Sequence, residues 1–270
     1  MHTASFHGGH WPRYLQALLA GAAVGALGGL IGLGGAEFRL PLLIGMFGFA
    51  ALAAVIMNKA MSLIVVASAL VFRTRAVPVE QLLDHWPIVV NLLAGSMFGA
   101  WWGASCATRV HARTLYRVIA ALLVAIACAL LLHHWLPSQG VALLQGPAQI
   151  VAGVLAGLAI GVVASLLGVA GGELLIPTIV LLFAVDIKLA GSLALVVSLP
   201  TMLVGFARYS RDGSFRVLRE NRAFLVVMAA GSLLGSLIGA SMLGAVPSAL
   251  LLPVLAIILF ASAWKVWQHG

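Results

Sequence analysis

The chain has 270 residues, of which 63% are hydrophobic and only 8% are charged, and its formal net charge is +8. A water-soluble domain carries about 25% charged residues, so this composition excludes a soluble globular protein. Apolar runs long enough to cross a bilayer predict an all-α polytopic membrane protein. In that class the excess of Lys and Arg belongs to cytoplasmic loops, so we expect no nucleic-acid partner.

Residues 1–12 contain three histidines and no apolar run, which predicts a polar N-terminal tail and no signal peptide. The tail is followed by a first membrane unit at 13–135, a linker at 136–146 and a second membrane unit at 147–267. Neither a metal ion nor another cofactor is expected. Ten apolar segments are predicted, at 13–33, 37–57, 59–77, 86–108, 113–135, 147–169, 173–186, 188–207, 222–244 and 247–267.

Segments 37–57 and 173–186 are the two whose crossing is in question, because each follows a helix-breaking motif and the second is short. Either one could be a half-helix or part of a re-entrant hairpin. The prediction is therefore eight to ten transmembrane segments.

The two membrane units look like copies of each other at an offset of 136 residues. GLGGAEFRLP at 32–41 matches GVAGGELLIP at 168–177, and KAMSL at 59–63 resembles LAGSL at 189–193 after a six-residue gap. That gap pairs Ser62 with Ser192. The ungapped pairs include Gly32 with Gly168, Gly35 with Gly171, Glu37 with Glu173, Pro41 with Pro177, Gly95 with Gly231 and Gly99 with Gly235.

Basic residues predict the orientation of the chain. If all ten segments cross and the N-terminus is cytoplasmic, most Lys and Arg residues fall on the cytoplasmic side, as the positive-inside rule requires. Both termini are then cytoplasmic. Five crossings per unit make the two repeats inverted, which is the favoured topology, whereas four crossings per unit would make them parallel.

Four ladders of glycine at every fourth residue predict helices that pack closely in the interior. A bare helix face allows another backbone to approach, so these glycines are expected to serve the scaffold. The ladders are Gly21, Gly25 and Gly29; Gly95, Gly99 and Gly103; Gly153, Gly157 and Gly161; and Gly231, Gly235 and Gly239.

The two motifs predict broken helices that meet near the middle of the membrane. Glycine clusters interrupt helices, and Pro41 and Pro177 are tolerated in the first turn of a new helix. Free N–H groups of such a turn carry partial positive charge and suit an anion. Gly34, Gly35, Gly171 and Gly172 would supply this backbone.

Glu37 and Glu173 have two interpretations. Each carboxylate would either cap the following helix or take up a proton beside a substrate, since ionisable groups at membrane depth are rare and usually functional. Their recurrence in both units favours the second. Arg39 has Leu175 as its counterpart, and it would either pair with Glu37 or contact an anion.

A second polar cluster is expected at the start of the helix that follows each motif. It comprises Asn58, Lys59 and Ser62 in the first unit and Lys188 and Ser192 in the second. Hydroxyl groups and a helix N-terminus would suit an anion. The competing interpretation is that the lysines reach out to the membrane interface.

The duplicated motifs resemble those of the TauE/SafE sulfite-exporter permeases. The resemblance covers about residues 15–267 and uses both glycine-proline motifs, together with Met61-Ser62-Leu63 and Gly191-Ser192-Leu193. Positions 61 and 191 depart from the threonine of the family pattern, and a glutamate stands where an apolar residue is common. The resemblance implies export of sulfite, organic sulfonates or related sulfur anions, driven by the proton gradient.

We therefore expect a secondary transporter of small anions such as sulfite or sulfoacetate, with protons as the coupling ion and no enzymatic activity. A passive anion channel is the alternative, and an intramembrane lipid-pyrophosphate hydrolase is a weaker one because no phosphate-binding cluster of Arg and Ser appears. The expected location is the cell membrane, in contact with lipid, and a homodimer is one expected assembly.

Overall fold

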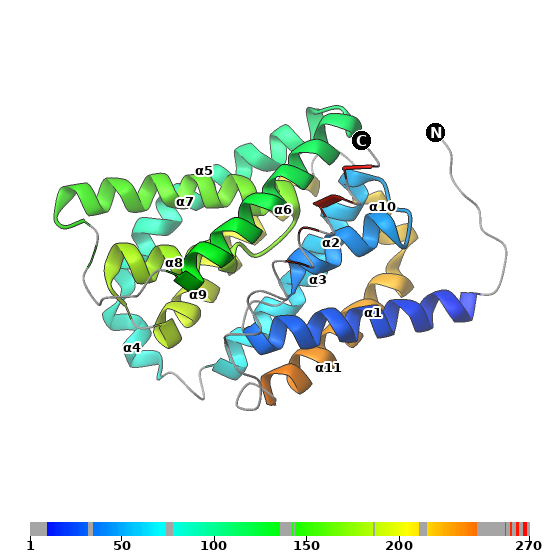
Figure 1. Cartoon of the computed structure of the whole chain (residues 1–270), viewed down its shortest axis with the longest axis horizontal. Helices are drawn as coiled ribbons and strands as arrows, with labels where there is room; N and C mark the ends of the chain where they lie inside the picture. Colours follow the sequence, from blue (N-terminus) through cyan, green and yellow to red (C-terminus); the bar gives the residue numbers. More distant parts are fainter. Residues whose placement is uncertain are drawn as a thin grey trace.

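The computed structural model describes residues 10–31, 35–73, 78–135, 142, 144–185, 187–210 and 215–241, with six further residues between 257 and 268. These parts are helical and contain no strand (Figure 1). The helices are α1 (His10–Ile31), α2 (Ala36–Gly45), α3 (Ala51–Arg73), α4 (Val79–Asp84), α5 (Trp86–Arg109), α6 (Ala112–Trp135), α7 (Pro147–Leu167), α8 (Gly172–Phe183), α9 (Ile187–Ser210), α10 (Arg216–Glu220) and α11 (Arg222–Ser241). The predicted N-terminal tail and the last predicted segment fall largely outside this description, as does most of the linker.

Five helices among the described residues are long and apolar enough to cross a membrane. They are Ala51–Val71, Trp86–Arg109, Pro147–Leu167, Leu189–Ser210 and Arg222–Gly239. The chain is thus a multi-pass membrane protein.

The predicted boundary between the segments at 37–57 and 59–77 is wrong. The structure has a short α2 that ends at Gly45 and a continuous α3 that begins at Ala51. The polar pair at 58–59 suggested a boundary, but the chain turns earlier, where Gly48 adopts a left-handed φ of 72°.

Neither α2 nor α8 is long enough to cross a bilayer alone. The 10 residues of α2 and the 12 of α8 extend about 15 and 18 Å at 1.5 Å per residue, against a hydrocarbon core of about 30 Å. Both are therefore half-length helices, which fits either of the two alternatives to a full crossing, a half-helix or part of a re-entrant hairpin.

The order of helices in the first half recurs in the second. Ala36, Ala51 and Trp86, which begin α2, α3 and α5, precede the starts of α8, α9 and α11 by 136 residues each. No gap is needed in this register. In this register the residue that corresponds to Ser62 of α3 is Ser198 of α9, and not Ser192, which the gapped comparison paired with it.

Two close helix pairs each join one half of the chain to the other (Figure 1). Along α1 and α11, Gly21 faces the Met228 carbonyl and Gly25 the Ser232 carbonyl, and residue numbers rise together on both helices, so the two helices run parallel. The α5–α7 pair is built in the same way, and it also runs parallel. An added Cβ at Gly95, Gly99, Gly157, Gly161, Gly231, Gly235 or Gly239 would likewise overlap backbone atoms of the facing helix.

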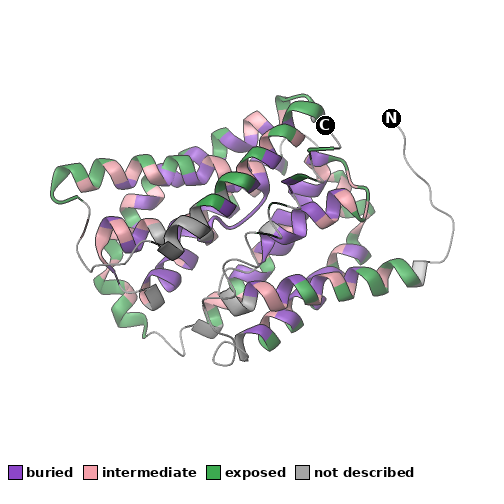
Figure 2. Ribbon diagram, in the orientation of Figure 1, coloured by how far each residue is buried: buried purple, intermediate pink, exposed green. Residues whose placement is uncertain are grey.

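Helices α3 and α9 pack against each other between these two pairs. Figure 2 shows buried residues along α2 and α3 and along the inner sides of α1, α5 and α7. In the Ala51–Val71 span, 56% of an apolar stretch of 18 residues is buried inside the molecule. The polar residues Arg39 of α2 and Asn58, Lys59 and Ser62 of α3 are buried in this central region, so they do not contact lipid.

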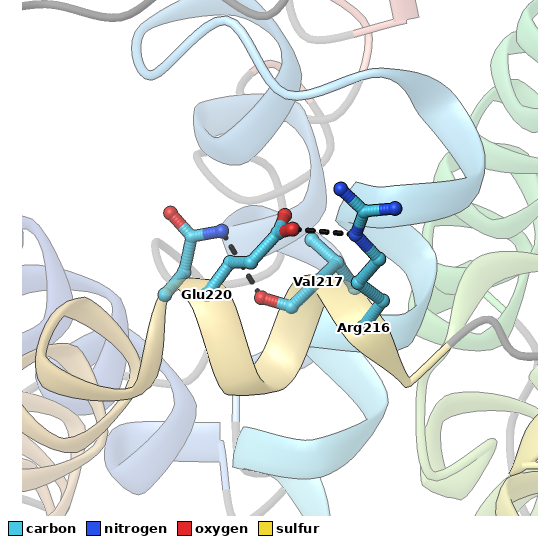
Figure 3. A network of polar contacts seen from close by, with 4 residues as sticks. Arg216, Val217 and Glu220 are labelled. Carbon is cyan, nitrogen blue, oxygen red and sulfur yellow. Dashed lines mark hydrogen bonds and ion pairs between the residues drawn. The ribbon is translucent and has the colours of Figure 1, made fainter.

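The short helix α10, which lies between α9 and α11 in the chain, carries an exposed ion pair. Arg216 Nε donates to Glu220 Oε1 at 2.6 Å, and Asn221 Nδ2 donates to the Val217 carbonyl at 3.0 Å (Figure 3). The hydrogen bond from Arg216 to Glu220 and the charge of that carboxylate raise the pKa of Arg216. The pair is open to solvent, so Glu220 is a suitable control position for experiments on the buried site.

A leucine at Gly99 is expected to separate α5 from α7. Its side chain would overlap the Leu158 carbonyl of α7, and backbone cannot move aside as a flexible side chain can. We expect a loss of about 3 kcal/mol or more in folding free energy, measured as a lower thermal midpoint in detergent. Phe98→Leu is the control, because Phe98 is 77% exposed on the outer face. An unchanged midpoint for Gly99→Leu would show that the two helices do not meet there.

A buried cationic site

Both glycine motifs lie where one helix ends and another begins. Gly35, with φ 69°, precedes α2, while Gly168, with φ 67°, ends α7 and Gly171, with φ 77°, precedes α8. These left-handed conformations favour glycine, and Gly172 is the first, buried residue of α8.

Pro41 lies inside α2 as its sixth residue. The prediction that Pro41 belongs to the first turn is therefore wrong, because α2 begins before Glu37. Pro177 has the same place in the sequence of α8. Gly34 lies outside the described residues, and so do the side chains of Glu37, Glu173, Pro177 and Lys188, although their backbones belong to α2, α8 and α9.

Arg39 joins three helices in the centre of the molecule. Its side chain is fully buried. From α2 its Nη1 donates to Asn58 Oδ1 at 3.4 Å and to Ser62 Oγ at 3.2 Å, both on α3, and its Nη2 donates to Ser232 Oγ of α11 at 3.2 Å. Arg39 received little weight in the sequence analysis, because its counterpart is Leu175, but in the structure it contacts Asn58 and Ser62 of the predicted polar cluster.

Asn58 connects the two motifs to each other. Its Nδ2 donates to the Ala36 carbonyl at the start of α2, at 2.9 Å, and to the Leu167 carbonyl at the end of α7, at 3.2 Å. Both amide hydrogens are thereby used, and the amide oxygen accepts from Arg39. One buried side chain therefore holds both broken-helix regions against α3.

Lys59 is also fully buried, and its Nζ donates to Ser165 Oγ of α7 at 3.1 Å. Together with Asn58 and Ser62, it lies near the middle of the Ala51–Val71 span. Two sequence-based interpretations are therefore wrong: this cluster is inside a helix and not at its N-terminus, and Lys59 does not extend to the membrane interface. The cause is the earlier start of α3.

The carbonyl groups at the end of α7 already have other donors. Ala164 O accepts from the Val169 amide, Ser165 O accepts from the Gly168 amide and from the Tyr209 hydroxyl at 2.8 Å, and Leu167 O accepts from Asn58. An ammonium group has three N–H donors. Among the described residues the Ser165 hydroxyl is the one hydrogen-bond partner of Lys59, which leaves two donors for a further acceptor.

Gly205 of α9 makes room for this ammonium group. A Cβ added at Gly205 would lie 2.7 Å from both Lys59 Nζ and Ser165 Oγ. Sequence reasoning missed Gly205, Ser165 and Tyr209, because each gains its role from a contact with a distant helix. Ser232 offered a signal, since it lies beside Gly231 on a predicted glycine ladder. Ser192 is buried on α9, six residues into that helix counted from Ile187.

The charges of this site set its chemistry. Two cationic side chains stand in the interior of a membrane protein, where a charge without compensation costs several kcal/mol. Such groups in membrane segments mark pathways for ions or substrates. The described hydrogen-bond partner of Lys59 is the hydroxyl group of Ser165, which is neutral.

A multi-pass helical protein with two half-helices and a cationic group at mid-span has the architecture of a membrane transport protein. The family model described as "Sulfite exporter TauE/SafE" matches residues 17–266, and the chain belongs to this family. It is therefore a membrane transporter. Searches of curated proteins and of solved structures found no match.

Proposed function

We propose that this protein is a secondary transporter of small sulfur oxyanions or organosulfonates, such as sulfite or sulfoacetate, and that the anion binds beside Lys59. The observation that carries the proposal is the buried ammonium group at mid-span, with a single described hydrogen bond to Ser165. An oxyanion would accept hydrogen bonds from the two remaining N–H groups of Lys59 and compensate the positive charge of its ammonium group. The family supports the sulfur chemistry of the substrate.

The burial of the site favours a carrier over a channel. Arg39, Asn58 and Lys59 are all 0% exposed, so within the described part of the chain these three side chains have no contact with solvent. A carrier needs such a closed state between its two open states, whereas a conducting channel needs a continuous pore.

Inverted repeats are part of the proposal, and helix directions support them. Arg208 Nε at the end of α9 donates to Ser105 Oγ near the end of α5 at 2.8 Å, so both helices end on one side. Only a short connection with α10 separates α9 from α11, which therefore starts from that same side. Since α5 ends where its counterpart α11 starts, the two run in opposite directions. The two halves would then exchange conformations during alternating access.

The test of the proposed function is counterflow in proteoliposomes. Vesicles loaded with unlabelled sulfite or thiosulfate should accumulate the labelled anion transiently, because a carrier exchanges bound substrate across the membrane. Carboxylates such as acetate should not support this exchange. Absence of accumulation, together with steady conductance of the anion, would identify a channel instead.

Gly205→Ala is expected to weaken anion binding through Lys59. The new methyl group would lie 2.7 Å from Lys59 Nζ, which is too close, so the ammonium group would have to move. We therefore expect about a tenfold rise in KM with a smaller change in kcat. The same substitution in a Lys59→Met background should have no additional effect on residual uptake. An equal effect in both backgrounds would mean that Gly205 only packs α9.

Glu37→Gln and Glu173→Gln are expected to flatten the pH dependence of uptake. If the carboxyl groups must be protonated before the anion enters, uptake by the natural protein rises as pH falls, and a neutral amide removes that requirement. Flux measured from pH 5 to pH 8 gives the profile. Glu220→Gln, in the exposed pair on α10, is the control and should keep the original profile. Unchanged profiles in both motif variants would exclude these glutamates as proton carriers.

A further inference from the structure

The second half of the chain contains an incomplete counterpart of the Arg39 site. In the 136-residue register, Ser198 corresponds to Ser62, and Ser96 corresponds to Ser232. These are the two hydroxyl groups that accept from the Arg39 guanidinium. Leu175 stands in place of Arg39, so the second half keeps the hydroxyl oxygens of the site without its cation.

Hydrogen positions follow from the bonds around these hydroxyls. Thr201 Oγ1 donates its one hydrogen to the Val197 carbonyl at 2.8 Å. In the 2.7 Å contact between Ser96 Oγ and Thr201 Oγ1, Ser96 must therefore be the donor. Both hydrogens are thus used, and what the pair still offers is oxygen lone pairs. Lone pairs repel an anion and suit a cation.

Ser198 adds a third oxygen on the same side of α9. It precedes Thr201 by three residues, which places the two on neighbouring positions of one helix face. Ser198 is 1% exposed, and its Oγ has no hydrogen-bond partner within the described structure. A buried hydroxyl without a partner costs about 1–3 kcal/mol, so its oxygen is available to a ligand.

We propose that Ser96, Ser198 and Thr201 form a binding site for a monovalent cation, with sodium as the ligand. Hard cations prefer oxygen ligands such as carbonyl groups and water, and a neutral hydroxyl oxygen offers similar lone pairs. The sodium ion would take the role in the second half that the Arg39 guanidinium fills permanently in the first. This site goes beyond the proposed anion transport, and it adds an exchangeable cation to the transport cycle.

The experiment compares thermal stabilisation of the purified full-length protein by NaCl, KCl and choline chloride at equal ionic strength. Sodium is expected to raise the thermal midpoint in a saturable manner, and choline is not. Thr201→Val and Ser198→Ala should each raise the half-saturating sodium concentration about tenfold or more. Thr178→Val is the matched control, because its hydroxyl likewise donates to a carbonyl four residues earlier, at 2.7 Å, but lies on α8.

Equal stabilisation by sodium and choline would overturn the proposal, as would an unchanged sodium response in both Thr201→Val and Ser198→Ala. If one variant fails to fold, the response of the other decides. Thiosulfate binding measured in choline buffer separates this site from the proposed anion site. Failure of the anion site would abolish that binding in the natural protein, whereas failure of the sodium site would leave it unchanged.

Discussion

Lys59→Met is expected to lower anion uptake at least about a hundredfold while the protein still folds. The substitution keeps a long apolar stem in the buried space but removes the charge and the N–H donors beside Ser165. Loss of one partner from a buried charge pair costs about 2–5 kcal/mol of binding, and 2.7 kcal/mol corresponds to a hundredfold change. Initial rates of labelled sulfite or thiosulfate uptake into proteoliposomes measure the effect.

Two further variants make this result specific. Lys59→Arg keeps the charge with a different geometry, so we expect partial uptake with a raised KM. Arg113→Met removes an exposed cation at the start of α6 and should leave uptake near its original rate. Full uptake by Lys59→Met would contradict the proposed anion site.

Asn58→Leu is expected to have the largest effect on stability among single substitutions at the site. It removes the donors to the Ala36 and Leu167 carbonyls and the acceptor for Arg39. Each buried polar group left without a partner costs about 1–3 kcal/mol, so we expect a total loss of roughly 3 kcal/mol or more. For a chain of this size the thermal midpoint should fall by about 6–12 °C.

Asn91→Leu is the matched control for this prediction. Asn91 also donates through Nδ2 to a carbonyl of another segment, Ile150 O, at 3.0 Å, but among the described residues it joins only that one carbonyl, and it is half-buried. A small shift is expected there. If Asn58→Leu shifts the midpoint no more than Asn91→Leu does, Asn58 does not hold the two motifs together.

The sequence alone predicted the membrane class, the glycine-packed helices and the family. These features depend on composition and on local patterns: the glycine ladders determine how closely backbones can approach, whatever the partner helix is. The half-helices also had a local signal, since the glycines at 35 and 171 precede short apolar stretches. The family match at residues 17–266 confirms the resemblance carried by the two motifs.

The geometry of the site could not be predicted in the same way. Asn58 and Lys59 looked like the polar start of a helix, and only the early start of α3 at Ala51 shows that they belong to its interior. Gly205 and Tyr209 surround the end of α7 through contacts with residues 40 or more positions away, which no local pattern encodes. Arg39 was given less weight because a comparison of the two halves favours residues that recur, whereas the contacts of Arg39 with Asn58, Ser62 and Ser232 need no counterpart in the second half.

The position of a bound anion would show whether the substrate binds beside Lys59. Selenite is a heavier analogue of sulfite, and its selenium gives an anomalous signal in crystals of the full-length protein. We expect a selenium peak within about 4 Å of Lys59 Nζ, on the side away from Ser165, since hydrogen bonds from N–H to oxygen extend about 3 Å. A selenium peak elsewhere in the membrane region, with Lys59 Nζ remote from it, would contradict the central claim.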